Sequence, residues 1–283
     1  MKQILVPINL RAQFQHVVKY AESVALKSGA RPVFYYAGGP WFMKGSEHQV
    51  YHSESPIEPF LDHIRNKRAR QTFQQVCEGL KQLGVDFSFK LSRNRSLSGL
   101  TQEVTEGAYD LLVMGSGTSH GIRGYLRSSV ARRVIATVKT PVFVIPQASR
   151  YNEIEHITYA VDLADYDPAV IQQVKSIAGL FDAKLTIVHV NSEGEGLQKE
   201  NYMTSLERTI SDTLDYPKIY YKFFDHADVF RGIKKFVTLN GSNLIAMTNR
   251  KSFTWRNFFS KKSMTGRMTR EMKVPILAFR KDN

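Results

Sequence analysis

The sequence predicts an α/β protein built from two tandem domains, each a mainly parallel sheet with helices on both faces. Three observations lead to this prediction: the length of 283 residues, an internal repeat, and an alternation of short apolar runs with helical periodicity. The length is close to twice the commonest domain size, about 100–150 residues. Strands that alternate with helices imply right-handed crossovers and parallel pairing.

The internal repeat divides the chain into two halves. Residues 4–10 (ILVPINL) align with residues 157–163 (ITYAVDL) at an offset of 153. Further along, residues 111–114 (LLVM) align with residues 244–247 (LIAM) at an offset of 133. A repeat of this length indicates one structural unit used twice.

The fall in offset indicates that the first half carries about 20 extra residues. We place them in the segment 38–56, which is rich in residues typical of loops. The polar segment 147–152 joins the halves. The predicted domains are therefore 1–147 and 152–283.

In the first half, apolar periodicity and glycine define the elements. The apolar run 4–8 is typical of a buried parallel strand. Gly29 and Gly84 each follow a segment with helical spacing, and glycine favours a helix end. The expected strands are 4–8, 32–37, 86–91, 111–114 and 141–145. The expected helices are 12–28, 57–83, 97–107 and 126–138.

The second half repeats this order. Ligands of such sheets bind beyond the carboxyl ends of the strands, where the strand order reverses. The expected strands are 156–161, 184–190, 218–224, 243–247 and 275–279. The expected helices are 167–181, 197–214, 227–240 and 262–272.

Composition excludes several classes of protein. A chain that is 42% hydrophobic and 23% charged is typical of a globular fold. The single Cys77 rules out an intrachain disulfide framework and suits a reducing compartment. No apolar run approaches the roughly 20 residues that span a bilayer, and Asn9 and Arg11 interrupt any early signal-peptide stretch. We therefore expect a cytoplasmic protein without a membrane partner.

The net charge of +13 is unevenly spread, because residues 1–150 hold 20 basic and 10 acidic side chains. A basic half fits a phosphate or nucleic-acid ligand, but solvated helix faces rich in Lys and Arg explain the same excess. The basic and aromatic loop 249–262 has two interpretations as well, a protein contact or a nucleic-acid surface. We favour the protein contact and keep nucleic-acid binding as an alternative.

A glycine-rich loop follows the fourth strand of the first half. Residues 115–124 read GSGTSHGIRG, and Ser128 and Ser129 stand at the start of the next helix. Glycines let backbone N–H groups approach an anion, and a helix N-terminus adds unpaired donors, so the pattern predicts a phosphate site. A plain turn with a serine N-cap is the alternative. The first strands of the two halves end at Asn9 and Asp162.

These segments together resemble a tandem universal stress protein, with two UspA-like domains in one chain. The resemblance covers essentially the whole chain and includes ILVPINL, LLVMG with its glycine loop, SSVARRVI and TPVFVIP. It implies two five-stranded parallel sheets of strand order 3-2-1-4-5, of the adenine-nucleotide-hydrolase-like type. It also implies that the two domains pair within the chain as a pseudo-dimer, with a homodimer as a further assembly.

The resemblance implies an ATP or ADP site in the first domain, or a site for another small anion. Where the family's nucleotide-binding motif has Asp, Gly and Gly, this chain has Asn9, Thr118 and Ser128. In the second domain no glycine occurs from residue 248 to 259, so that copy is degenerate and suited to stability or partner contact. The cofactor-binding candidates are Pro7, Asn9, Met114, Gly115, Thr118, Ser128, Ser129 and Val130.

The predicted function is a binding or regulatory module of the stress response that is not an enzyme. No nucleophile with its base, Walker A loop or GxGxxG fingerprint is present. A weak ATP hydrolase is an alternative, although Asp162 and the glycine loop fall in different halves. A scaffold that binds no nucleotide is another. No metal site is predicted, because His48 and His52 lie in a segment expected to be a loop.

Overall fold

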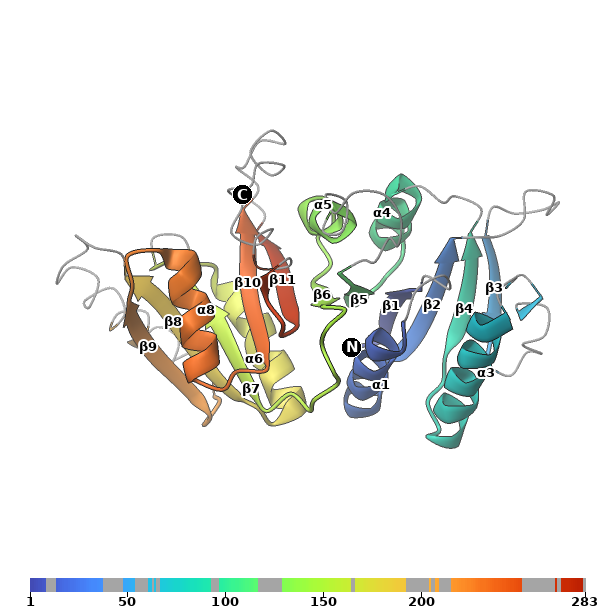
Figure 1. The fold of residues 1–283 in the computed structure, drawn as a ribbon, viewed down its shortest axis with the longest axis horizontal. Coiled ribbons are helices and arrows are strands. Elements are labelled where there is room, and N and C mark those ends of the chain that lie inside the picture. The colour runs from blue at the N-terminus through green and yellow to red at the C-terminus, as the bar shows by residue number, and fades with distance from the viewer. Residues whose placement is uncertain are drawn as a thin grey trace. The chain divides into compact units, whose positions relative to one another are not determined.

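The structure is a computed structural model in which the chain forms two compact units, Met1–Tyr151 and Asn152–Asn283 (Figure 1). The residues described are 1–8, 14–37, 48–53, 61–62, 64, 67–92, 97–116, 129–163, 166–191, 204, 207–208, 215–250, 268 and 271–281.

The first unit has an α/β fold whose sheet contains six strands among the described residues. Its strands lie side by side in the order β3-β4-β2-β1-β5-β6. Every neighbouring pair is parallel except β3 and β4. In chain order the elements are β1 (Gln3–Pro7), α1 (Gln15–Ser28), β2 (Arg31–Ala37), β3 (His48–His52), α3 (Lys67–Gln82), β4 (Ser88–Ser92), α4 (Leu97–Glu106), β5 (Leu111–Gly115), α5 (Ser129–Thr137) and β6 (Val142–Ile145).

Helices cover both faces of this sheet, with α1 and α3 on one face and α4 and α5 on the other (Figure 1). Strand β4 shows how the sequence divides the faces, since successive residues of a strand point to opposite sides. Phe89 packs on Phe73 of α3, with ring centroids 5.1 Å apart. Its neighbour Lys90 forms an ion pair with Glu103 of α4. An apolar core therefore lies under α3, and a polar contact holds α4.

The antiparallel strand β3 corrects the prediction for the segment 38–56, which we expected to be a loop. It pairs with β4, from His48 opposite Ser92 to His52 opposite Ser88. The sheet of this unit is therefore mixed, and the predicted set of five parallel strands does not describe it. An edge strand is held by backbone hydrogen bonds to one neighbour, so it needs no alternating apolar pattern.

Helix α3 is shorter than the predicted helix 57–83. It begins at Lys67, and Ile64 instead closes a separate turn through a bond from its N–H to the Leu61 carbonyl at 2.9 Å. The predicted end is confirmed, because Gly84 follows the helix with a φ of 67°. Cys77 lies on α3 with 3% exposure, and burial raises the pKa of its thiol to about 12. Its expected role as a packing residue is confirmed.

The second unit has five parallel strands in the described residues, in the order β9-β8-β7-β10-β11. Its helices begin at aspartate caps: Asp167 accepts from the Ala169 N–H at 2.9 Å, and Asp228 accepts from the Arg231 N–H at 2.7 Å. The elements are β7 (His156–Ala160), α6 (Pro168–Phe181), β8 (Lys184–Asn191), β9 (Ile219–Asp225), α8 (Val229–Leu239), β10 (Leu244–Arg250) and β11 (Ile276–Lys281).

An apolar cluster attaches α8 to its sheet. It includes Phe230 and Ile233 of the helix, Val190 of β8 and Ile245 of β10, each at most 5% exposed. Two predicted helices of this half, 197–214 and 262–272, lie largely outside the described residues.

Candidate functional site

The strand order of the first unit reverses between β1 and β5. From β1 the chain proceeds to β2 on one side, and from β5 it proceeds to β6 on the other. The two strands are parallel neighbours, with Leu5 opposite Leu112. Crevices at such a reversal, beyond the carboxyl ends of the strands, are where open α/β sheets bind ligands.

Pro7 and Gly115 are the last residues of these two strands, so the structure brings both to the predicted edge. Each strand end is fixed by a further backbone bond of 2.9 Å: the Ile8 N–H donates to the Tyr35 carbonyl, and the Ser116 N–H donates to the Ile145 carbonyl. Gly115 offers its backbone without a side chain, which leaves room for a ligand to approach the chain.

The structure describes only some of the other predicted site residues. Met114, the residue before Gly115, is buried with 5% exposure. Ser129 is the first residue of α5, where unpaired N–H groups are expected, and Val130 is 45% exposed. Asn9, Thr118 and Ser128 lie outside the described residues, as does most of the glycine loop.

The same position in the second unit, between β7 and β10, holds a hydroxyl contact that the first unit cannot make. Thr248 takes the place of Gly115 in the repeat, and Tyr159 takes the place of Val6. Their hydroxyl groups lie 2.9 Å apart, and Tyr159 is 1% exposed. This pair was not predicted, because only the strand register shows that the two residues meet.

A buried histidine further fixes the carboxyl edge of the second unit. His189 of β8 is 6% exposed, and its Nδ1 lies 3.1 Å from the Val161 carbonyl. Because a carbonyl only accepts, Nδ1 carries the proton. Asp162, the predicted acid at the end of the first strand of this half, directly follows Val161 and is exposed. The backbone just before Asp162 is thus attached to β8 by a hydrogen bond.

His156 lies in a buried polar group at the amino end of β7. Its Nε2 is 2.9 Å from the Thr186 hydroxyl and accepts from the Asn240 side-chain amide at 3.0 Å. Burial, followed by the nearby Lys184, lowers the pKa of His156 below its ordinary value of 6.5. The imidazole is therefore neutral in the folded protein at neutral pH.

The lowered pKa of His156 predicts that the second unit is less stable in acid. Below pH 6.5 the unfolded chain binds a proton at His156 and the folded chain does not, so stability falls as the pH drops from 6.5 towards the lowered pKa. The slope is at most about 1.4 kcal/mol per pH unit. Urea unfolding of the second unit between neutral and mildly acidic pH should show this fall, and His156→Gln should flatten it. The exposed His52→Gln serves as the control and should leave the pH dependence of the second unit unchanged.

The described residues contain no group of three or more His, Cys, Asp and Glu side chains arranged to hold a metal ion. His48 and His52 are four residues apart on strand β3, so their Cα atoms are about 13 Å apart, too far for one shared ion. Among the described helices, none is long and apolar enough to cross a membrane. The basic loop from residue 251 to 262 lies outside the described residues.

Comparison with known proteins identifies the family. The sequence model described as the universal stress protein family matches residues 1–146, more than half of the chain. The chain belongs to the universal stress protein family. The family match covers the half that holds the glycine loop, and it confirms the resemblance inferred from that loop and the flanking strands. No protein with curated annotation matches the sequence.

Solved structures share the fold of this universal stress family member. One is a universal stress protein from Archaeoglobus fulgidus DSM 4304, 14% identical, with a TM-score of 0.66. The match covers 99% of this chain and 97% of that one. Another is a functionally unknown protein from Pseudomonas aeruginosa PAO1, 12% identical, with a TM-score of 0.67. It covers 100% of this chain and 93% of that one. At such identities the similarity supports the α/β fold alone.

Proposed function

We propose that this universal stress family member is a stress-response binding module that takes a nucleotide, ATP or ADP, at the carboxyl ends of β1 and β5. It acts through occupancy of the site rather than through turnover. The proposed contacts are Pro7 and Asn9 at the end of β1, Gly115 and Thr118 after β5, and the serines that begin α5. The second unit carries no nucleotide and contributes stability or a partner contact.

One observation carries the proposal: β1 and β5 end side by side at the strand-order reversal, with a bare glycine at the end of β5. Helix α5 begins at Ser129, so its N-terminal N–H donors follow the glycine loop in sequence. A helix N-terminus with glycine-flanked N–H groups favours phosphate oxygens. In the second unit, Thr248 stands in place of Gly115 and its hydroxyl contacts that of Tyr159, which supports a division of roles between the units.

We propose a cytoplasmic location, which fits the single buried thiol of Cys77. We also propose two tandem universal-stress-like domains that pair within the chain as a pseudo-dimer. Scaffolding without nucleotide, nucleic-acid binding and weak ATP hydrolysis are the rival functions that the following experiment separates.

The test is mass spectrometry of the denatured, as-purified full chain, together with thermal unfolding in the presence of millimolar ATP. ATP or ADP should be released, and ATP should raise the melting temperature, because a ligand at about 100 times its Kd stabilises the folded state by about 2.7 kcal/mol. Gly115→Val should abolish both effects, since the new side chain stands where phosphate approaches the backbone. The matched control is Thr248→Val at the equivalent position of the second unit, which should bind nucleotide as the wild type does.

Each rival function predicts a different result. If no nucleotide is released and ATP leaves the melting temperature unchanged, the nucleotide proposal is wrong and a scaffold is favoured. Steady release of ADP from added ATP indicates a hydrolase. Affinity for nucleic acid that falls by several orders of magnitude between low and moderate salt indicates a nucleic-acid surface.

A further inference from the structure

A cavity of about 330 Å³ lies between helix α1 and the segment that follows β6. Gln15, His16 and Lys19 from the first two turns of α1 line one side, and Gln147, Arg150 and Tyr151 line the other. All of these residues belong to the first unit. The volume of the cavity is at the lower end of the range for small-molecule sites, about 300–1,000 Å³. None of its residues is among those assigned to the nucleotide site.

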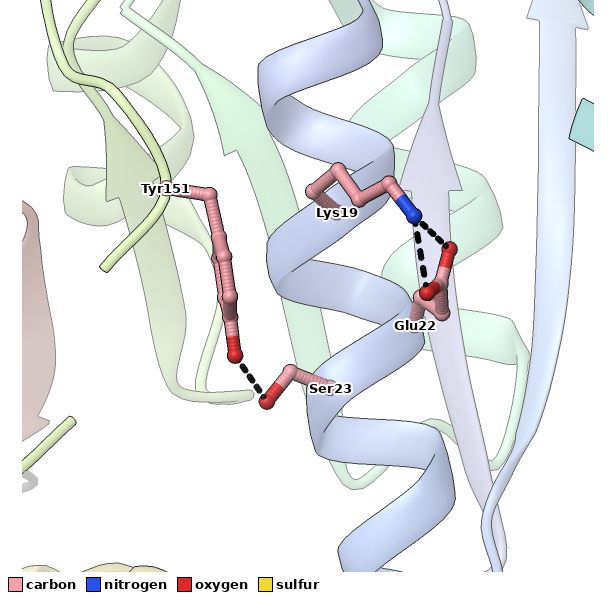
Figure 2. Close-up of polar contacts among 4 residues, drawn as sticks. All are labelled: Lys19, Glu22, Ser23 and Tyr151. Atoms are coloured by element: carbon pink, nitrogen blue, oxygen red, sulfur yellow. Dashed lines mark hydrogen bonds and ion pairs between the residues drawn. The ribbon is translucent and has the colours of Figure 1, made fainter. Parts of the chain in front are cut away.

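The wall formed by Tyr151 is fixed in place. The Tyr151 hydroxyl donates to Ser23 Oγ on α1 at 2.8 Å (Figure 2). The Tyr151 ring meets the ring of Tyr20 edge to face at 5.0 Å, and the Tyr20 hydroxyl donates to the Arg150 carbonyl at 3.3 Å. These contacts hold residues about 130 positions apart in place before any ligand binds. This preorganisation lowers the entropic cost of binding. Tyr151 remains 38% exposed and offers an aromatic surface to the cavity.

The charges of the cavity favour a single negative charge on the ligand. Lys19 Nζ donates to both carboxylate oxygens of Glu22 at 3.0 Å (Figure 2), so this pair is neutral. Arg150 then supplies the net positive charge. Burial lowers the pKa of His16, so its imidazole is neutral at neutral pH and can donate or accept. None of the residues that line the cavity is acidic. A triphosphate carries more negative charge than these groups balance.

We propose that this cavity is a second ligand site of the first unit, which binds a small planar monoanion of the aromatic carboxylate class. The carboxylate lies against the Arg150 guanidinium, whose paired N–H groups match two carboxylate oxygens. The flat body of the ligand packs on Tyr151. The site is independent of the proposed nucleotide function and stands even where that function fails.

The test uses benzoate as the probe and benzyl alcohol as its uncharged analogue, added to the full-length chain. Ring resonances of His16 and Tyr151 in NMR spectra should shift with benzoate and not with benzyl alcohol. Arg150→Gln should weaken benzoate binding about tenfold or more, because it removes the charge-assisted hydrogen bonds. Arg68→Gln, which removes an exposed cation from α3 of the same unit, is the matched control and should bind benzoate as the wild type does.

Two further variants separate this site from folding defects and from the nucleotide site. Tyr151→Leu keeps the charges and removes the aromatic surface, so it should also weaken binding. Gly115→Val should leave benzoate binding intact, whatever it does to ATP. Equal affinity for benzoate in Arg150→Gln and Arg68→Gln would overturn the proposal. Equal binding of benzyl alcohol and benzoate, or no shift at tens of millimolar benzoate, overturns it as well.

Discussion

Phe73→Ala is expected to lower the free energy of unfolding of the first unit by about 3–5 kcal/mol. Phe73 of α3 has 0% exposure and contacts three aromatic rings outside its helix. Its centroid lies 5.1 Å from that of Phe89, 5.9 Å from that of Phe34 and 6.2 Å from that of Phe14. Truncation removes the transfer free energy of the ring and leaves a cavity that these neighbours cannot fill. Because Phe73 joins α3 to β2 and β4, the whole helix depends on it.

Urea unfolding of the full chain, followed by amide exchange of residues in β2 and β4, measures this loss. Gln74→Ala on the exposed side of the same helix is the control, and it should change stability by less than about 0.5 kcal/mol. Phe73→Leu keeps much of the apolar volume and should fall between the two. A loss below about 1 kcal/mol in Phe73→Ala contradicts the proposed packing.

Buried parallel strands and helix ends were predictable from the sequence. The run 4–8 became β1 at Gln3–Pro7, and Gly29 ends α1 with a φ of 67°. Such strands are continuous apolar runs, because both of their faces are covered. A glycine at a helix end is also predictable, because few other residues adopt a left-handed backbone without strain.

The strand β3 was not predictable by the same reasoning. Its residues HQVYH have no alternating pattern of apolar and polar side chains, and Val50 is 50% exposed. The strand exists because β4 presents a free edge of backbone donors and acceptors, and a sequence pattern does not record that edge. The start of α3 at Lys67 was also missed, since the helical spacing of 57–83 does not mark the residue at which a helix begins.

The position of the candidate site was predictable from the sequence, but its side-chain contacts were not. The alternation of elements located the edge, and glycines after the fourth strand located the loop. The Tyr159–Thr248 contact in the second unit depends on the register of β7 against β10, where Ala160 lies opposite Met247. The sequence alone showed the lost glycines of that half but not the side chains that fill their place.

The buried ion pair of the first unit is another contact that the sequence hides. In the strand SFKLS, Lys90 alternates with apolar residues and would be expected to face water. Its ammonium instead lies 2.6 Å from one oxygen of Glu103 and 2.8 Å from the other. The Tyr109 hydroxyl donates to the same carboxylate at 2.6 Å. Burial and then the Glu103 carboxylate raise the pKa of Tyr109, so its hydroxyl keeps the proton it donates.

Glu103→Ala is therefore expected to destabilise the first unit by about 3 kcal/mol, the lower end of the range for breaking a buried pair. The Glu103 side chain is 3% exposed, and its removal leaves Lys90 and Tyr109 without their shared acceptor. The lower end applies because the Lys90 side chain keeps 22% exposure and can partly regain water. Glu106→Ala on the exposed side of α4 is the matched control and should cost less than about 0.5 kcal/mol. A similar loss in both variants contradicts a specific role for the pair.

The double variant Lys90→Met, Glu103→Leu tests how much the ion pair contributes to the stability of the first unit. Removing both charges creates an apolar interface. Replacing a buried ion pair by well-packed apolar residues is often neutral or stabilising. The double variant should therefore recover most of the stability that Glu103→Ala loses, apart from the cost of the Tyr109 hydroxyl left without its acceptor. Tyr109→Phe in the same background should remove that remaining cost. If the double variant is as unstable as Glu103→Ala, the pair itself supplies net stability, and the position of α4 depends on charge rather than on burial.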